Sequence, residues 1–255
     1  MANKSDPRDI KLSAQPNIGS DEQPLRNKIL LETPGKERAT IFHLLDFVRM
    51  DTHAVLHEAG ELISHAYFLN DGLASILNVM GDGKSVEIGL TGKEGFVGLP
   101  LIVGFSTSPS RVVAQVAGSA FRISAGNLAE ALRQCPNLQR QLNRFAQIMM
   151  MQAGQIAACN RIHDVEERLA RWLLMSQDRL GGDRITLTQE FLAHMLGTRR
   201  ASVTVAAGAL QKAGLIKYTR GEVKVVDRVR LEGAACECYQ AMVIQSRNWE
   251  KESKL

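Results

Sequence analysis

The chain has 255 residues, of which 45% are hydrophobic and 23% charged, and its formal net charge is +4. This ordinary globular composition excludes a disordered, collagen-like or disulfide-rich chain. The length allows one large domain or two smaller ones, and the patterns below favour two. The sequence has neither an apolar run of membrane-spanning length nor the apolar core of a signal peptide. We therefore expect no membrane partner and a cytoplasmic location.

Residues 1–24 are polar, rich in Asp, Ser, Asn and Pro, and lack periodicity, which predicts a flexible tail. In residues 25–136, short apolar stretches alternate with glycine, and nine of the 21 glycines lie between Gly60 and Gly104. The strand-like runs are Ala66–Leu69, Ser75–Met80, Ser85–Ile88 and Arg111–Val116, with Asp82-Gly83 as a hairpin turn. This pattern predicts an antiparallel β-roll of the jelly-roll type.

Residues 137–163 are predicted to form one long helix. Proline is absent, Gly154 is the only glycine, and apolar residues recur at alternating spacings of four and three. So narrow a stripe is typical of a two-stranded coiled coil, and we expect the helix to pair with its copy in a homodimer. The alternative is a long helix packed on its own domain. The predicted dimer interface comprises Leu142, Phe145, Met149, Gln152, Ile156 and Cys159, with polar Gln152 fixing the register.

Basic charge is concentrated in the carboxy-terminal part of the chain. Residues 161–230 contain 13 basic and 8 acidic side chains, a net charge of +5. All other residues together contain 18 basic and 19 acidic side chains, a net charge of −1. A positive domain attached to a neutral one predicts a polyanionic partner for the positive part and a different role for the other.

The positive segment carries the most specific pattern in the chain. A helix over Val165–Leu180 ends at Gly181-Gly182, and the strand-like Ile185–Leu187 follows. Thr188 is a suitable N-cap for a second helix that ends at Leu196, and a third runs from about Arg199 to Ala213.

The spacing of three residues identifies the last two helices as a helix-turn-helix. Ala193 is small where the helices cross, Gly197 permits the turn, and Val203 locks the second helix onto the first. Two alternating strands around Arg220-Gly221 complete a winged helix-turn-helix. The alternative, a helical pair used only for packing, does not require two exposed arginines at this corner.

The start of the second helix of this pair is rich in arginine and hydroxyl side chains. Arginine can read guanine with two hydrogen bonds, and Ser or Thr can hold phosphate. In a recognition helix the amino-terminal end points into the major groove. The predicted DNA contacts are Thr188, Gln189, Thr198, Arg199, Arg200, Ser202 and Thr204.

A glycine-rich β-roll, a long dimerising helix and a winged helix-turn-helix, in this order, resemble the Crp/Fnr family of bacterial transcription regulators. The resemblance covers residues 44–226 and is strongest at Val165–Leu174, Leu187–Ala193 and Leu196–Arg200. It implies an α+β chain with a cyclic-nucleotide-binding-like sensor domain at 25–136, a dimerisation helix at 137–163, a DNA-binding domain at 164–232 and a tail at 233–255. The implied partners are a second copy, palindromic double-stranded DNA and, for an activator, RNA polymerase.

The resemblance also assigns roles to single residues of the DNA-reading helix. It implies that Arg200 touches a guanine, while Arg199 and Ser202 face phosphate. Cyclic-AMP-responsive members complete the base reading with a glutamate and a second arginine, where this chain has Ala201 and Val205. We therefore expect a half-site that differs from the cyclic-AMP type.

By the same resemblance, Gly98, Leu99, Arg111 and Val112 mark an effector pocket. Cyclic-AMP binders place a glutamate on the ribose and a Ser or Thr after the phosphate-binding arginine, where this chain has Leu99 and Val112. An apolar side chain facing a buried sugar hydroxyl disfavours the nucleotide, so we expect no response to cyclic AMP. Arg111 either serves another anion or braces a turn.

The cysteines give weaker signals. No cysteine precedes Cys135, so the amino-terminal iron–sulfur cluster of the family's oxygen-sensing branch is not expected. Cys159 is interpreted as a small buried hydrophobe. Cys236 and Cys238 could bind a soft metal or form a redox switch, but with only two close thiols and no histidine nearby a structural role is favoured. We expect no metal and no cofactor.

The leading hypothesis is a homodimeric, sequence-specific transcription regulator that binds DNA and takes an unknown small-molecule effector, if any. The sequence contains no nucleophile elbow, phosphate loop, zinc-protease pair or kinase motif set, so we do not expect an enzyme. The alternative is a non-DNA effector-binding adaptor built on a β-roll. Salt-dependent binding to a palindrome separates the two hypotheses.

Overall fold

The computed structural model describes residues 24–219 and 221–252; the tail expected at residues 1–24 lies almost entirely outside them. The described residues form two compact units, one within residues 1–75 and 91–143 and the other within residues 76–90 and 144–255. The second unit therefore includes a hairpin from the region that the sequence assigned to the sensor domain. Within the described residues, no helix is both long and apolar enough to cross a membrane.

Antiparallel sheets form the roll that the glycine-rich texture predicts. One sheet has the order β1-β8-β3-β6 and the other β2-β7-β4-β5. The strands are β1 (Asp46–Met50), β2 (Val55–His57), β3 (His65–Leu69), β4 (Leu73–Val79), β5 (Ser85–Thr91), β6 (Phe96–Val97), β7 (Ser110–Val116) and β8 (Gly118–Ser124). All four predicted strand runs are confirmed, as is the Asp82-Gly83 turn, where Gly83 has a φ of 82°.

An aromatic cluster forms the centre of the first sheet. Phe121 of β8 pairs in register with Phe47 of β1 and with Phe68 of β3. The rings of Phe68 and Phe96 are 4.8 Å apart, and both are almost fully buried. Burying each such ring contributes about 1.5 to 3 kcal/mol to the stability of the fold.

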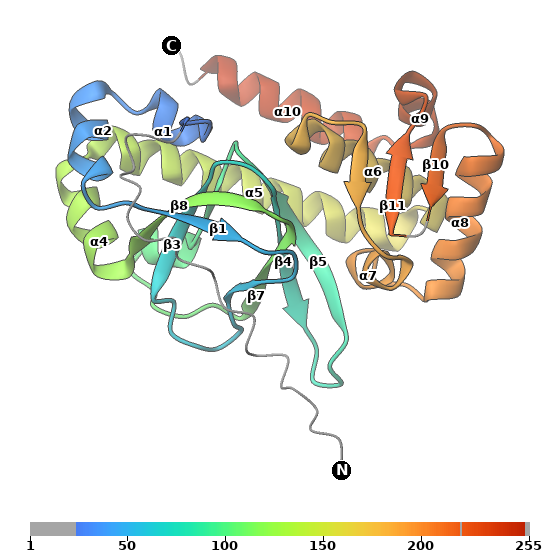
Figure 1. The fold of residues 1–255 in the computed structure, drawn as a ribbon, viewed down its shortest axis with the longest axis horizontal. Helices are drawn as coiled ribbons and strands as arrows, with labels where there is room; N and C mark the ends of the chain where they lie inside the picture. The colour runs from blue at the N-terminus through green and yellow to red at the C-terminus, as the bar shows by residue number, and fades with distance from the viewer. Residues whose placement is uncertain (1–23, 220, 253–255) are drawn as a thin grey trace. The chain divides into compact units, whose positions relative to one another are not determined.

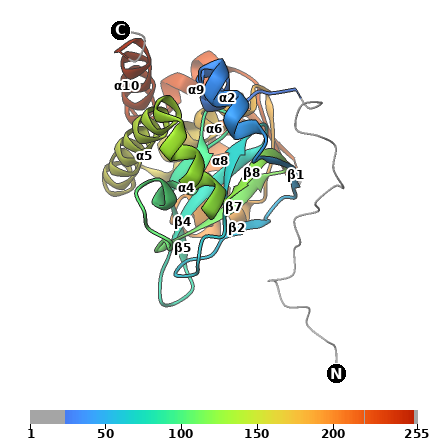
Figure 2. The same cartoon turned by 90° about the vertical axis from the view of Figure 1, so that its left-hand side faces the viewer.

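Four short helices accompany the first sheet: α1 (Lys28–Glu32), α2 (Gly35–Phe42), α3 (Leu99–Ile102) and α4 (Ala125–Gln134). Helix α2 lies beside α4 in both views (Figure 1, Figure 2). Glu37 of α2 accepts hydrogen bonds from the backbone N–H groups of Asn137 and Leu138, at 3.3 and 3.0 Å. These are the first, otherwise unsatisfied N–H groups of the next helix, so Glu37 acts as its N-terminal cap.

Helix α5 (Pro136–Ile162) is the long helix that the sequence predicts. Its apolar stripe packs against its own chain. The side chain of Gln152 accepts from Leu90 N at 2.8 Å and donates to Leu90 O at 3.2 Å, so it pairs with the strand backbone of β5. Met149 lies against Gly89, where a Cβ atom would come within 2.7 Å of the methionine methyl.

The winged helix-turn-helix follows in the second unit (Figure 1). It comprises α6 (Val165–Leu180), β9 (Arg184–Thr186), α7 (Gln189–Met195), α8 (Arg200–Lys212), β10 (Ile216–Thr219) and β11 (Glu222–Val225). The small sheet is antiparallel with the order β10-β11-β9, and Gly221, with a φ of 79°, stands in its turn. Helix α6 packs on α8, and its buried Trp172 donates to Glu87 of β5 at 3.0 Å.

The segment expected to be a tail after residue 233 is instead largely helical as far as residue 252. Helix α9 (Arg228–Ala234) is followed by α10 (Cys238–Glu252), which packs on α6. Arg228 donates to Asp178 at 2.7 Å and to the hydroxyl of Tyr239 at 2.6 Å, and this hydroxyl donates to Asp178 at 2.9 Å. The contacts with α6 stabilise this helix.

Candidate nucleic-acid interface

The turn between α7 and α8 has the geometry that the sequence predicts. The side chain of Thr188 caps α7 by accepting from Phe191 N at 3.2 Å. Gly197 has a φ of 56°, a conformation that favours glycine. The next N–H, of Thr198, donates to the carbonyl of Ala193 at 2.9 Å, and Arg168 of α6 donates to the carbonyl of Leu196. Backbone and side-chain hydrogen bonds therefore hold the turn at both ends.

Helix α8 separates a buried face from an exposed one. The buried face comprises Val203, Ala206, Ala207 and Leu210, as the sequence predicts. Arg199 occupies the N-cap position, and both Arg199 and Arg200 are exposed. Among the described residues, neither guanidinium forms a hydrogen bond or an ion pair. Two unpaired cations at the positive end of a helix dipole form a site that attracts phosphate.

Two of the predicted DNA contacts also touch one another. The hydroxyl of Thr204 lies 2.9 Å from Oε1 of Gln189 and 3.0 Å from the carbonyl of Arg200. A hydroxyl has one proton, so it donates to one of these oxygens at a time. When it donates to Gln189, the amide NH₂ of Gln189 points away from the hydroxyl and is free to donate to a phosphate.

The predicted DNA contacts therefore come from one short region, and their roles toward DNA stay predictions. Thr188 and Gln189 lie at the start of α7, and Thr198, Arg199, Arg200, Ser202 and Thr204 lie in the turn and the first half of α8. Sequence reasoning gave no contact role to Val205. This side chain is 74% exposed on the same half of α8 as Arg200, and the exposure of an apolar residue beside the predicted DNA contacts is the signal that identifies it.

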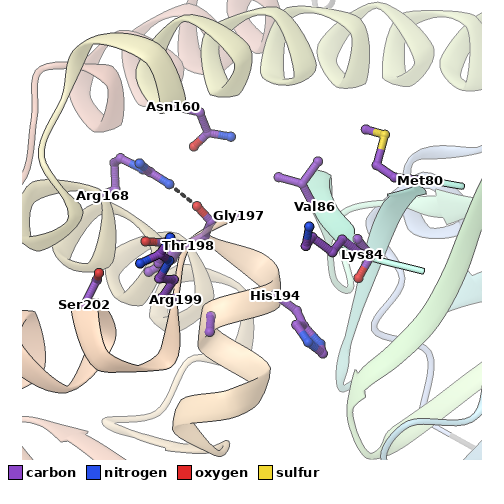
Figure 3. Close-up of a pocket in the computed structure, with 13 residues that line it drawn as sticks. Met80, Lys84, Val86, Asn160, Arg168, His194, Gly197, Thr198, Arg199 and Ser202 are labelled. Carbon is purple, nitrogen blue, oxygen red and sulfur yellow. Dashed lines mark hydrogen bonds between the residues drawn. The ribbon is translucent and has the colours of Figure 1, made fainter. Parts of the chain in front are cut away.

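A hollow of 850 Å³ lies beside the turn, within the second unit. Figure 3 shows Lys84 and Val86, from the β4–β5 hairpin, opposite Thr198 and Arg199 across this space. Val86 also lies against the turn, since a Cβ atom on Gly197 would come within 3.0 Å of its methyl group. Lys84 forms a solvent-exposed ion pair with Asp82 at 2.6 Å.

Two residues of the predicted effector pocket, Gly98 and Arg111, make close contacts within their own chain. Gly98 has a φ of 114°, and a Cβ there would come within 2.8 Å of Ala66, so glycine is required. Arg111 donates through Nε to both carboxylate oxygens of Glu58. Burial raises the pKa of Glu58, but the hydrogen bonds from Arg111 and the Ala59 backbone outweigh it and hold this pKa below its usual value. Of the two roles that the sequence left open for Arg111, this pairing favours the structural one.

The predicted dimer seam requires a correction. All six of its residues, Leu142, Phe145, Met149, Gln152, Ile156 and Cys159, are buried in the isolated chain. Side chains that are already covered by their own protomer cannot be the surface that a partner helix covers. The alternative, a helix packed on its own chain, describes this stripe. Periodicity detects that a face is buried but does not identify what buries it.

Two family models match the chain. A cyclic nucleotide-binding domain matches residues 47–135, and a Crp-like helix-turn-helix domain matches residues 167–234. The first covers most of the β-roll, and the second covers the interface described above. No curated protein sequence matches the chain.

Solved structures with the same fold include three bacterial proteins. FixK2 from Bradyrhizobium japonicum aligns with a TM-score of 0.65 and 16% identity over 75% of this chain and 98% of its own. A candidate Crp/Fnr-family transcriptional regulator from Eubacterium rectale aligns with a TM-score of 0.64 and 16% identity over 82% of this chain and 98% of its own. The c-di-GMP-responsive global regulator CLP of Xanthomonas campestris aligns with a TM-score of 0.62 and 17% identity over 75% of this chain and 99% of its own.

The two family models succeed one another in the order of the β-roll and the helix-turn-helix, and together they include the strands and helices that define both parts. The fold of the solved structures agrees with this order over most of the chain. The chain therefore belongs to the Crp/Fnr family of transcription regulators.

Proposed function

We propose that the protein is a sequence-specific transcription regulator that binds a palindromic site on double-stranded DNA as a homodimer. The observation that carries this proposal is the pair of exposed arginines at the start of α8, which form no ion pair among the described residues and lie next to the hydroxyl groups of Thr198 and Ser202. Arg200 reads guanine in the major groove, and Arg199 and the hydroxyl groups hold phosphates. The protein acts in the cytoplasm, where its DNA and RNA polymerase are found, and has no catalytic role.

The exposed side of α8 adds a second element of base reading. Val205 follows Arg200 by five residues and carries an exposed isopropyl group. An apolar side chain of this size at the groove floor matches the C5-methyl group of thymine. The half-site then combines a guanine for Arg200 with a thymine for Val205, which differs from the pattern that a second arginine would read.

The dimer forms through the face of α5 that its own chain leaves uncovered. This face contains Gln147, Met150, Gly154, Ala157 and Ala158, at the helical spacing of three and four. Met150 is 62% exposed, and a Cβ on Gly154 would meet nothing within 4 Å. Small residues at such spacing let a second α5 approach closely, and burying Met150 favours association.

The protein does not respond to cyclic AMP. A cyclic phosphate would have to displace Glu58 from Arg111, and the ribose would meet Leu99 in place of a carboxylate. Exchanging a charged hydrogen bond that is already made for a new one yields little net affinity. Any effector of this protein therefore differs from cyclic AMP in its anchoring groups.

DNA binding is tested by selecting fragments of the host genome with the full chain and measuring the salt dependence of binding to the selected site. A protected pair of half-sites about 34 Å apart, with an affinity that falls steeply with salt, supports the proposal. Binding that ignores the DNA sequence, or no binding at all, contradicts it.

A further inference from the structure

Four metal-ligating side chains converge where the end of α5 meets the start of α10. Cys159 and His163 are four residues apart, and Cys236 and Cys238 are two apart, 73 or more residues later. The Sγ atoms of Cys159 and Cys236 are 3.4 Å apart, and Sγ of Cys238 lies 3.6 Å from Nδ1 of His163. All four ligand atoms lie within 4.8 Å of one another.

These separations match a tetrahedral zinc site. Zinc binds sulfur at about 2.3 Å and imidazole nitrogen at about 2.0 Å, which places ligand atoms about 3.5 to 3.8 Å apart around the ion. Three thiolates and one imidazole are a ligand set that zinc takes in structural sites. The cluster therefore needs small side-chain adjustments, rather than a change of backbone, to close around an ion.

The imidazole is oriented for ligation. Nδ1 of His163 faces the sulfur of Cys238, while Nε2 lies 3.0 Å from a carboxylate oxygen of Glu237. A metal-bound histidine almost always donates its other ring N–H to a carboxylate, carbonyl or water. Gln155 donates to Sγ of Cys238 at 3.1 Å, as an outer-shell group does to a thiolate.

The surroundings also supply the charge that such a site needs. The three cysteines are at most 4% exposed, and Arg171 of α6 is 2% exposed. Among the described residues, the guanidinium of Arg171 has no carboxylate partner, and its one hydrogen bond is to Sδ of Met175. A buried cation without an anion is costly. Three thiolates around one dication leave a single negative charge, which neutralises Arg171.

We propose that Cys159, His163, Cys236 and Cys238 bind one zinc ion as a tetrahedral Cys₃His site. The ion joins the end of α5 to the start of α10 across the intervening winged helix-turn-helix. This proposal overturns the expectation of no metal site, which depended on the absence of a histidine near Cys236 in the sequence. It is independent of the DNA contacts, because none of the four residues belongs to α7 or α8.

A disulfide between Cys159 and Cys236 is the competing use of these residues. It would employ two of the four donors and leave unexplained why His163, held by Glu237, faces Cys238. The test below separates the two, because a disulfide removes two hydrogens from the mass of the chain and excludes a thiolate-rich metal site.

The experiment uses the full chain, purified anaerobically without an added thiol reductant, and measures zinc by elemental analysis. We expect close to one zinc per chain. After removal of zinc by a chelator, titration with Co²⁺ should give the intense visible bands and thiolate-to-cobalt charge transfer of a tetrahedral site, saturating at one equivalent. A weak octahedral spectrum, or a chain without zinc that carries a Cys159–Cys236 disulfide, overturns the proposal.

Variants locate the site. Cys238→Ser should lose the charge-transfer band in part and bind Co²⁺ at least about 10-fold more weakly, while Cys135→Ser, a buried cysteine outside the cluster, should bind like the wild type. Glu237→Gln, at an exposed position, should keep the stoichiometry and weaken Co²⁺ binding about 10-fold. Equal Co²⁺ affinities for Cys238→Ser and Cys135→Ser overturn the proposal. If Cys238→Ser does not fold, the Co²⁺ titrations of the wild type and of Glu237→Gln still test the proposal.

Discussion

Arg111 donates through Nε to both carboxylate oxygens of Glu58, at 2.8 and 3.0 Å, across 53 residues of sequence. Arg111 is the residue that the family resemblance implies for holding an anionic ligand in the effector pocket. An arginine that is already matched by a carboxylate gives a new anion little net free energy. The hydrogen bonds between Arg111 and Glu58 therefore affect which ligands the sensor domain binds.

The first prediction concerns this pair. Titration calorimetry of the full chain with cyclic AMP should give no saturable heat in the micromolar range. Glu58→Gln removes the competing charge and should increase binding of the nucleotide measurably, while Glu58→Gln with Arg111→Ala should not. Micromolar affinity of the wild type, together with altered DNA binding, would contradict the assignment of the effector pocket.

The second prediction separates Arg200 from Arg199. On a helix the two side chains point about 100° apart, so they cannot both reach the groove floor. Arg200→Ala should cost about 1 to 3 kcal/mol of binding free energy and relax the preference for one guanine per half-site. Arg199→Ala should weaken binding to all sequences alike and flatten the salt dependence.

Both arginine variants are measured on the natural site and on one with that guanine replaced. If Arg200→Ala loses affinity equally on both DNAs and Arg199→Ala loses it only on the natural site, the two roles are reversed.

The third prediction concerns Val205 and the methyl group of thymine. Replacing the contacted thymine by uracil removes only this methyl group and should cost the wild type about 0.8 kcal/mol, the value of one buried methylene-sized group. The Val205→Ala variant should bind the two DNAs with nearly equal affinity. Titrations of both proteins on both DNAs form a double-mutant cycle, and a coupling free energy near zero would show that the two groups do not touch.

The fourth prediction contrasts the two faces of α5. Met150→Glu with Ala157→Glu places charge on the uncovered face and should yield folded monomers, observed by equilibrium sedimentation together with a cooperative melt. Met149→Glu with Ile156→Glu buries two carboxylates in the chain and should unfold it. Dimers that persist in the first variant would show that α5 is not the interface.

The fifth prediction is a pH dependence of stability. Burial lowers the pKa of His57, whose side chain is 8% exposed, below 6.5. Because the folded state resists protonation of His57 and the unfolded state does not, its contribution is fully present above about pH 6.5 and is lost as the pH falls below it. His57→Gln should reduce this loss between pH 7 and 5, as measured by urea unfolding at each pH. An unchanged pH dependence would contradict the assignment.

The helix-turn-helix could be predicted almost to the residue, because its signals are local. A cap at Thr188, a small residue at Ala193 and a glycine at Gly197 act within a few residues of chain, and the structure places each in the expected role. Buried faces were also recognisable in α5 and α8. The surfaces that cover these faces could not be predicted. A helix packed on a partner helix and a helix packed on a hairpin of its own chain show the same apolar period of 3.5 residues.

The cysteine and histidine cluster could not be predicted from spacing. Cys159 and Cys236 are 77 residues apart, and no periodicity relates them. They meet because α10 returns to α6 beside the end of α5, and that return depends on the hydrogen bonds between Arg228, Asp178 and Tyr239. In the sequence, Cys236 and Cys238 stand out as a pair. Cys159 and His163 come close to them only through tertiary packing.

The hydrogen bond from Trp172 to Glu87 gives the protein a built-in optical reporter. The indole is 1% exposed and its N–H is held by a buried carboxylate of β5, so its emission depends on whether this strand stays against α6. The only other tryptophan, Trp249, lies on α10 and is partly accessible. With Trp249 replaced by phenylalanine, the fluorescence of a single residue would follow the β5 hairpin in real time as DNA or a small molecule is added.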